Sequence, residues 1–576
     1  MRQPFIIYNS SFIIKKLFII AFLLYYSNSF SQFVKPHAQL KSDLKKHILF
    51  LANDSLQGRA TGSRGEAMAA DYIVKQYKAL ELQPMMPYDN YIQPFKYTFK
   101  VYLGKKNTLK YIESGNNGNF PLYKAFYPLN NSGSGVAFAR AITAGFGIEA
   151  PKLNHDDYSP LDKENIKGKI FVIKVGYPDA KIHSAYAEYD IDYRIDLAIK
   201  NGAAGIVFIN DQDSAFNPDS AIKIKANRKN IPIVFCSDKR IMMGRKSKDP
   251  IFFIETEIIK EEKTGHNIIA FIDNGQENTV VIGAHYDHLG MGEISGSLHK
   301  GKPEVHNGAD DNASGVAALL ELASQLKGDA KATGNNYIFV AFSGEELGLY
   351  GSSHFVSDMG FGIRAFNYML NMDMVGRLDS TKNILAVSGT GTSPKWALLD
   401  SIKNLLFTVK KSESGVGPSD HTSFYKEKIP VLHFFTGNHS DYHKPNDDEK
   451  YINYEGEAQV IYYIYNIILQ MDKQGKLAYT ATKDNAENDR PRFKVTMGIM
   501  PDYLYEGSGI KVDGVTDQKP AAIAGIVKGD IIIELGGVKT TDMQQYVKAL
   551  GGHNKGDKVT CKLLRGGKEV ALQVVF

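Results

Sequence analysis

The chain has 576 residues, 43% of them hydrophobic and 23% charged, which is the composition of a globular protein long enough for three or four domains. Its formal net charge is +5, and three positive charges, on Arg2, Lys15 and Lys16, lie in the first 31 residues, so the remainder carries +2. This near balance, without a basic run interleaved with aromatic residues, excludes nucleic acid as an expected partner.

The N-terminal segment is typical of an export signal. Lys15-Lys16 precede the apolar run Leu17–Tyr26, and Ser29-Phe30-Ser31 supplies small residues for a cleavage site. An uncleaved membrane anchor is the alternative, but ten apolar residues are about half of what a membrane-spanning helix needs. We therefore predict a signal peptide over residues 1–31 and an exported protein, periplasmic or extracellular, without membrane attachment after cleavage.

Residues 33–115 contain an early helix. In EAMAADYIVKQYKALELQP (66–84) the apolar residues Ala70, Ile73, Val74, Tyr77 and Leu80 follow helical spacing, and the final proline ends the helix. The glycine-rich run GRATGSRG (58–65) before it lacks the sequence pattern of a phosphate-binding loop, so we interpret it as a structural loop.

Residues 120–255 form a different kind of unit. KGKIFVIKVGYP (167–178) and NIPIVFCSD (230–238) predict strands, and DLAIKNGAAGIVFIND (196–211) predicts a helix, a glycine turn and a strand. We expect this unit to be an insertion into a larger domain. The two cysteines, Cys236 and Cys561, fall in apolar strands of different domains, which predicts buried thiols rather than a disulfide.

Residues 266–475 alternate predicted strands with predicted helices. The strands are NTVVIGAH, YIFVAFS, AFNYMLNMDMV and IPVLHFF, and the helices are VAALLELASQL and AQVIYYIYNIILQM. This alternation predicts an α/β fold with a mostly parallel mixed sheet sandwiched by helices. Residues 476–492 are polar and are interpreted as a linker. Residues 493–576 then predict a small, separate β-rich domain.

Five side chains that suit a metal ion lie in the α/β region, each in a short motif. The motifs are GAHYDHLG (283–290), GADDNASG (308–315), SGEELGLYGS (343–352), NMDMVG (371–376) and DYHKPNDD (441–448). Several follow strand ends directly, where open α/β sheets place their sites. Two histidines and three carboxylates are the right donors for two zinc ions that share one bridging carboxylate. The predicted ligands are His285, Asp311, Glu346, Asp373 and His443.

Three further residues have roles in metal-assisted hydrolysis. Glu345, next to a ligand, is the candidate general acid/base, and Asp287 can accept the second ring N–H of His285. Tyr442 can donate its phenol to the tetrahedral oxyanion. Asp420-His421 is placed either at the rim of the site or directly behind its ligands. The histidines His288, His299, His306 and His433 are interpreted as structural or surface residues, His306 being the nearest to the cleft. A serine nucleophile is the competing chemistry, but no G-x-S-x-G motif occurs.

The five motifs resemble those of the co-catalytic di-zinc aminopeptidases, whose clan includes glutamate carboxypeptidase, the transferrin receptor and glutaminyl cyclases. The resemblance covers roughly residues 40–110 and 266–475. It implies one zinc on His285, Asp311 and Asp373. It implies the other on Asp311, Glu346 and His443, with Asp311 bridging and Glu345 as general acid/base. Asp311 is preferred to Asp310 because the family's bridging aspartate stands three residues before Ser-Gly.

Two other regions also resemble known domains. Residues 120–255 resemble a protease-associated domain, and residues 493–576 resemble a bacterial PDZ domain, in which Met497–Met500 stands where a C-terminal peptide would bind. The expected function is an exported zinc aminopeptidase that hydrolyses the N-terminal residue of peptides with a hydroxide bridging two metal ions. The alternatives are a carboxypeptidase that uses Arg377 for the terminal carboxylate, another amidohydrolase on the same metals, or an inactive binding protein.

Overall fold

The computed structural model divides the chain into two compact units, and the second of them, Lys96–Lys263, interrupts the first. The predicted signal peptide, residues 1–31, lies outside the described residues. No helix in the described part of the chain is both long enough and apolar enough to span a membrane. The structure describes residues 35–576 apart from 113–117, 180–184, 187, 225, 239–240, 242–249, 295, 403–406, 483–494, 503–504, 506, 517, 542 and 554–555.

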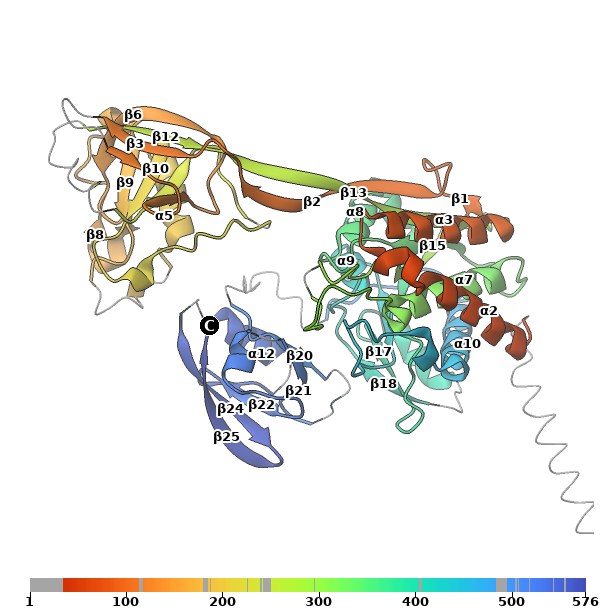
Figure 1. Ribbon diagram of the computed structural model, residues 1–576. Helices are drawn as coiled ribbons and strands as arrows, with labels where there is room; N and C mark the ends of the chain where they lie inside the picture. Colours follow the sequence, from red (N-terminus) through yellow and green to blue (C-terminus); the bar gives the residue numbers. More distant parts are fainter. Residues whose placement is uncertain are drawn as a thin grey trace, which may run out of the picture. The chain divides into compact units, whose positions relative to one another are not determined.

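A nine-stranded mixed sheet forms the centre of the first unit, which we call the α/β domain (Figure 1). Neighbouring strands pair in parallel from β15 through β14 and β16 to β19, while β1 and β13 add antiparallel strands at one edge and β17 with β18 close the other. The predicted mostly parallel mixed sheet is confirmed. The bounds are β1 (Gln83–Pro84), β2 (Ile92–Leu103), β13 (Ile258–Ile272), β14 (Thr279–His285), β15 (Asn336–Phe342), β16 (Phe366–Met372), β17 (Ile384–Ser388), β18 (Thr408–Ser412) and β19 (Val431–Phe435).

Helices cover both faces of this sheet because its strands are apolar on both sides. Along β14, Val280 and Ile282 point into one hydrophobic core, and Val281 between them points into the other. The first core packs under α2, α3, α7 and α10, which contact one another, and the second packs under α8 and α9. The bounds are α2 (His37–Leu51), α3 (Arg64–Ala79), α7 (Gly315–Leu326), α8 (Tyr350–Asp358), α9 (His421–Lys426) and α10 (Tyr454–Met471).

The predicted early helix is α3. Its N-cap, Ser63, accepts a hydrogen bond from the backbone N–H of Glu66, and Ile73 and Tyr77 are fully buried. The glycine-rich run before it forms a short loop, η1 (Asp54–Arg59), that continues into α3. This loop reaches the carboxyl end of β14, because the N–H of Gly290 donates to the carbonyl of Gly58. The loop therefore belongs to the surroundings of the predicted site.

The second unit, the inserted domain, contains an eight-stranded sheet with one longer helix. Its boundaries differ from the predicted 120–255, and residues 96–115 do not belong to the α/β domain as expected. The reason is that β3 pairs with β12, far along the chain, a contact that leaves no local signal in the sequence. The predicted strands and helix inside it are present. The bounds are β3 (Thr108–Ile112), β4 (Gly118–Phe120), β5 (Phe126–Pro128), β6 (Gly135–Thr143), β9 (Ile170–Lys174), α5 (Ile191–Lys200), β10 (Gly205–Ile209), β11 (Ile233–Cys236) and β12 (Ile251–Thr256).

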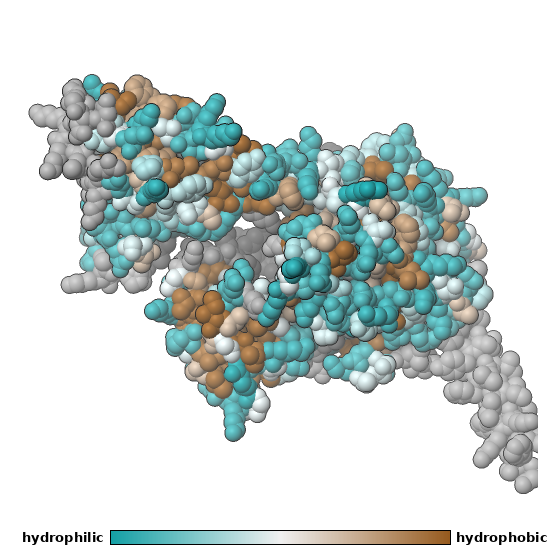
Figure 2. Space-filling view, in the orientation of Figure 1, coloured by the Kyte–Doolittle hydropathy of each residue, from teal (hydrophilic) through white to brown (hydrophobic). Residues whose placement is uncertain are grey.

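The C-terminal region, from about residue 495, is the predicted β-rich domain. Its strands follow the order β20, β21, β22, β24 and β25, so that β20 is at an edge. Figure 2 shows hydrophobic residues on the surface of this domain, where Ile523, Val527 and Val575 are exposed. Cys561 here and Cys236 in the inserted domain are buried, and neither forms a disulfide, as predicted. The bounds are β20 (Ile499–Pro501), β21 (Ile510–Val515), α11 (Pro520–Ile523), β22 (Ile531–Leu535), β23 (Val538–Lys539), α12 (Met543–Gly551), β24 (Lys558–Arg565) and β25 (Lys568–Val575).

Candidate metal centre

Three adjacent parallel strands deliver three of the five predicted ligands to one edge of the sheet. β14 ends at His285, β16 ends one residue before Asp373, and β15 ends shortly before Glu346. His285 lies opposite Phe342, the last residue of β15, so the strands end at the same level. This is the carboxyl edge of the sheet, where α/β folds place their loops and their functional sites.

The other two ligands come from loops that meet this edge. Asp311 lies in the turn that leads into α7, and His443 lies in the loop between β19 and α10. Two contacts fix the ring of His443 from outside: its Nδ1 lies 3.0 Å from the carbonyl oxygen of Gly296, and its own carbonyl accepts the N–H of Leu298. Its Nε2 is therefore the nitrogen that faces the site.

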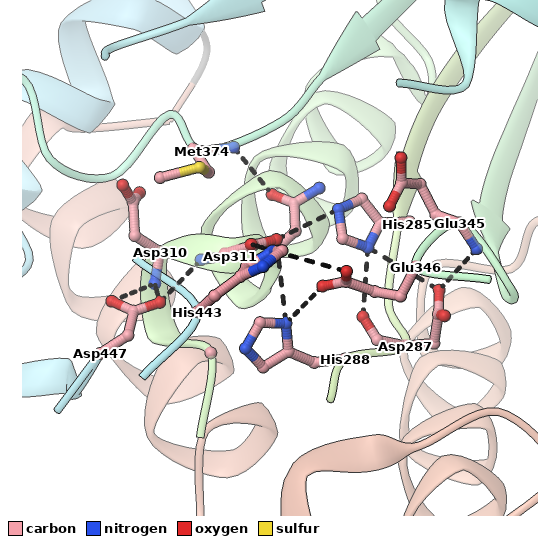
Figure 3. A network of polar contacts seen from close by, with 12 residues as sticks. His285, Asp287, His288, Asp310, Asp311, Glu345, Glu346, Met374, His443 and Asp447 are labelled. Carbon is pink, nitrogen blue, oxygen red and sulfur yellow. Dashed lines mark hydrogen bonds and ion pairs between the residues drawn. The ribbon is translucent and has the colours of Figure 1, made fainter. Parts of the chain in front are cut away.

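Asp311 is at the centre of the arrangement (Figure 3). One carboxylate oxygen lies 3.3 Å from Nε2 of His285, and the other lies 3.2 Å from Nε2 of His443. His285 is also 3.3 Å from Asp373, and His443 is 3.5 Å from Glu346. The ligand atoms of His285, Asp311 and Asp373 all lie within 4.8 Å of one another. All five predicted ligands thus converge around Asp311. The second group whose ligand atoms all lie within 4.8 Å of one another contains His288, Asp311 and Glu346, and His443 lies beside it through its contacts with Asp311 and Glu346.

Asp310, the alternative to Asp311, faces away from both groups. Its carboxylate accepts the N–H of Gly376 at 2.7 Å and lies 3.4 Å from Nε2 of His439. Asp447, four residues after His443, accepts the backbone N–H groups of both Asp310 and Asp311 at 3.0 Å. Asp447 therefore fixes the turn in which Asp311 is the residue that reaches both histidines.

The electrostatics of the cluster favour a bound cation. Burial opposes a charge on His443, but the carboxylates of Glu346 and Asp311 outweigh it and raise the pKa of His443 to about 9. Burial likewise opposes the charge of Asp311, but His288, His285 and His443 hold its pKa well below the ordinary value. Imidazole and carboxylate are good zinc donors. The surrounding histidines keep the carboxylate of Asp311 ionised, which is the form that binds a metal ion. The residues present therefore fit zinc.

The side chain of Asp287 does something other than predicted. The second ring nitrogen of His285 lies 3.1 Å from the backbone carbonyl of Asp287, not within hydrogen-bond distance of its carboxylate, which is 3.7 Å away. The Asp287 carboxylate instead accepts the hydroxyl of Thr61 at 2.9 Å and the backbone N–H of Glu345 at 3.2 Å. Asp287 thus orients His285 through its main chain and Glu345 through its side chain.

Glu345 and Tyr442 both line the cleft beside the predicted ligands. Burial, together with nearby Glu346 and Asp373, raises the pKa of Glu345 well above the ordinary value for a glutamate. A raised pKa of this kind is common among carboxyl groups that act as general acids or bases. The ring of Tyr442 stacks on His443, with ring centroids 3.8 Å apart.

Asp420 and His421 are fully buried, so of the two predicted positions they occupy the one behind the ligands and not the rim. His421 stacks on His433 with ring centroids 4.4 Å apart, and both rings line the cleft. Burial lowers the pKa of His433 to about 4. Both histidines are therefore neutral packing partners behind the ligands.

Two residues near the ligands were not identified from the sequence. His288, interpreted as structural, lies 2.7 Å from Glu346. Arg59, in the glycine-rich loop, is fully buried and donates to the carbonyls of Tyr286, Asn307 and Gly308, which precede or follow ligands in the chain. The repeated histidine in HYDH was the available signal for His288, whereas nothing local marked Arg59.

Two regions of the chain match known families. Residues 267–468 match peptidase family M28, and residues 486–575 match the PDZ domain. The first match covers the five predicted ligands, and the second covers the β-rich C-terminal domain. The peptidase and PDZ resemblances are therefore confirmed, whereas the protease-associated domain over residues 120–255 stays a prediction.

Curated relatives share the M28 region. An aminopeptidase of Pseudomonas aeruginosa is 25% identical over 264 residues, 43% of this chain and 46% of that protein. A probable leucine aminopeptidase of Arthroderma benhamiae is 30% identical over 182 residues, 31% of this chain and 48% of that protein. The chain therefore spans about half the length of these relatives. Aminopeptidase YwaD of Bacillus subtilis is 23% identical over 315 residues, 52% of this chain and 65% of that protein.

The solved structures that this chain matches include two aminopeptidases. One is an aminopeptidase from Aneurinibacillus sp. strain AM-1, with a TM-score of 0.40, 22% identity and coverage of 76% of this chain and 94% of that chain. The other is a zinc aminopeptidase from Bacillus subtilis, with a TM-score of 0.40, 21% identity and coverage of 77% and 96%.

Proposed function

We propose that this chain, whose residues 267–468 form a domain of peptidase family M28, is an exported zinc-dependent aminopeptidase that removes N-terminal residues from peptides. The observation that carries the proposal is the pair of histidine and carboxylate groups that share Asp311 at the carboxyl edge of the sheet. Relatives named aminopeptidases, including those from Pseudomonas aeruginosa and Bacillus subtilis, support the reaction class.

Two zinc ions fit the two groups. His285, Asp311 and Asp373 would hold one, and Asp311, Glu346 and His443 would hold the other. Zinc in this position lowers the pKa of bound water, so that hydroxide is available near neutral pH, and it polarises the carbonyl of the peptide bond. The protein fixes where these donors lie.

Glu345 would move the proton that hydrolysis requires. The Asp287 carboxylate holds its backbone N–H, and its side chain lines the cleft together with His285 and Asp373. A carboxylate at this point would accept a proton from the attacking water and return it to the amine that leaves. Tyr442, stacked on His443, would donate its phenol to the developing oxyanion.

Arg377, the residue that the carboxypeptidase alternative would use for a terminal carboxylate, is partly engaged within the protein. Its guanidinium donates to Asp441 at 3.0 Å and lies 2.9 Å from a ring nitrogen of His439, and the plane of the group lies over the ring of Tyr451. An arginine that recognises a terminal carboxylate needs its N–H donors unengaged. In Arg377 one guanidinium nitrogen, Nη1, makes both of these polar contacts, so this nitrogen is engaged within the protein.

The Glu345→Gln variant tests the proposed role of Glu345. Glutamine has nearly the same shape but cannot accept and return a proton, so we expect turnover of an aminoacyl substrate to fall by at least about 100-fold. Zinc content should remain that of the unsubstituted protein, because Glu345 is not one of the ligands. Full activity in this variant would contradict the assignment of the general acid/base.

The proposal extends to the accessory regions. The inserted domain would be a protease-associated domain, and the PDZ domain would bind a C-terminal peptide by strand addition at Met497–Met500. The position of β20 at the edge of its sheet supports strand addition, since an edge strand has unpaired backbone groups. Export and periplasmic or extracellular location follow from the predicted signal over residues 1–31.

A further inference from the structure

His288 makes a short contact with one of the predicted ligands. Its Nδ1 lies 2.7 Å from Oε1 of Glu346, whereas His443, on the other side of that carboxylate, lies 3.5 Å from Oε2 (Figure 3). The same nitrogen is 3.9 Å from Asp311. The His288 side chain has no solvent exposure. It therefore faces Glu346 from the protein interior.

The geometry identifies Nδ1 as the proton donor. An ionised carboxylate only accepts hydrogen bonds, so a 2.7 Å contact requires a hydrogen on Nδ1. The other ring nitrogen, Nε2, has no hydrogen-bond partner among the described residues. A nitrogen that carries a hydrogen toward a carboxylate does not offer a lone pair to a metal ion. The contact is thus the kind that orients a ligand rather than one that binds the ion directly.

The chain is shaped to hold this ring. Gly308 has a φ of +56°, and a Cβ there would come within 2.5 Å of Cδ2 of His288. Residue 308 must therefore be glycine both for its backbone and for the ring. The N–H of His288 donates to the carbonyl of Arg59, whose guanidinium donates to the carbonyl of Gly308. The ring is consequently enclosed by two loops tied together through Arg59.

We propose that His288 is a positioning residue for the second metal position: it donates Nδ1–H to Oε1 of Glu346 and so directs Oε2 toward His443 and Asp311. This inference rests on the proposed function, because it assumes that Glu346 holds a metal ion. A glutamate side chain has three rotatable bonds, and fixing it in advance removes an entropy loss on metal binding. Residues that orient a ligand in this way typically contribute about 10- to 100-fold to metal affinity.

Asparagine and glutamine distinguish the two ring nitrogens. The side-chain amide nitrogen of asparagine is as many bonds from the backbone as Nδ1 of histidine, and that of glutamine extends to the position of Nε2. His288→Asn therefore restores a donor to Glu346, whereas His288→Gln and His288→Ala do not. Neither amide is a good zinc donor, so recovery in His288→Asn would come from the hydrogen bond and not from ligation.

The experiment is a titration of each metal-free variant with zinc in competition with a chromophoric chelator. The unsubstituted protein should bind two zinc ions. In His288→Ala and His288→Gln the affinity for one of them should fall at least about 10-fold, and in His288→Asn it should stay within about 3-fold of the unsubstituted value. His299→Asn is the matched control, because its ring contacts Lys302 and Glu304 and not a predicted ligand.

The outcomes separate this role from the proposed function. Two zinc ions with unchanged affinity in His288→Ala would overturn the role of His288 and leave the two-ion site intact. An asparagine variant as weak as the alanine variant would also overturn it, since the ring would then act as a direct ligand. Fewer than two ions in the unsubstituted protein would overturn the two-ion site and this inference with it. If the alanine variant does not fold, the asparagine and glutamine pair decides the question.

Discussion

Glu457 in α10 is a buried carboxyl group whose effect on stability depends on pH. Its side chain is fully buried, and neither carboxylate oxygen has a hydrogen-bond partner among the described residues. Burial, and then the nearby carboxylates Asp310 and Glu321, raises the pKa of Glu457 well above its ordinary value of 4.5. The folded protein therefore keeps a proton on Glu457 over a range of pH in which the unfolded chain has lost it.

The sign and size of the effect follow from linkage. Because the folded state binds more protons than the unfolded state above about pH 4.5, the free energy of unfolding falls as pH rises, by about 1.4 kcal/mol per pH unit, until the raised pKa is reached. Glutamine has the same shape and does not titrate. The stability of Glu457→Gln relative to the unsubstituted protein should therefore increase as pH rises above about 4.5, by at most about 1.4 kcal/mol per pH unit.

The single tryptophan provides the assay. Trp396 lies in the α/β domain, is 1% exposed and donates its ring N–H to Thr392, so its fluorescence reports the unfolding of that domain. Urea unfolding would be followed at pH 5, 6 and 7. An equal dependence on pH in Glu457→Gln and the unsubstituted protein would refute the reasoning.

Glu455, two residues earlier in α10, is the control. Burial opposes its charge, but the hydrogen bonds and charges of Lys41 and His37 together outweigh burial and lower the pKa of Glu455 to about 2. Its contribution is present above the unfolded pKa of about 4.5 and is lost as pH falls toward 2. Since its side chain is 53% exposed, Glu455→Gln should cost less than about 1 kcal/mol. Glu455 itself is mostly ionised in both the folded and the unfolded state between pH 5 and 7, so its own titration adds little pH dependence there.

Two more predictions concern the metal centre. Asp447→Ala leaves the buried N–H groups of Asp310 and Asp311 without an acceptor, which should lower stability by about 2–6 kcal/mol and weaken zinc binding. Asp447→Asn keeps one acceptor oxygen and should lose less stability than Asp447→Ala. An equal loss of stability in the two variants, measured by Trp396 fluorescence during unfolding, would contradict this. Removal of zinc with a chelator should lower the thermal midpoint of unfolding reported by Trp396. If zinc had been present at 100 times its Kd, the free energy of unfolding should fall by about 2.7 kcal/mol. An unchanged midpoint would mean that no ion is bound in the folded protein.

The convergence of the five predicted ligands could be expected from the sequence because each lies where a recognisable strand or loop ends. β14, β15 and β16 have apolar runs that are evident in the sequence, and parallel neighbours end at one edge, so His285, Glu346 and Asp373 had to be close. The M28 match covers the same segment. The residue pattern predicts this clustering because the hydrophobic periodicity of the strands and the topology of the sheet agree.

The remaining contacts depend on tertiary structure. His288 and Glu346 are 58 residues apart, and Arg59 reaches carbonyls more than 200 residues away. The exchange of roles at Asp287, where the carbonyl contacts His285 and the carboxylate holds Glu345, depends on one turn after β14. Likewise, residues 96–115 join the inserted domain because β3 pairs with β12. No hydrophobic periodicity in the sequence indicates these contacts.

The most direct test of the account measures zinc content together with hydrolysis of matched substrates that carry either a free or an acetylated N-terminus. The account predicts two zinc ions per chain and activity only on substrates with a free N-terminus. Activity on acetylated substrates with a free C-terminus would contradict it in favour of a carboxypeptidase. Two bound ions without turnover of any substrate would contradict it in favour of a binding protein.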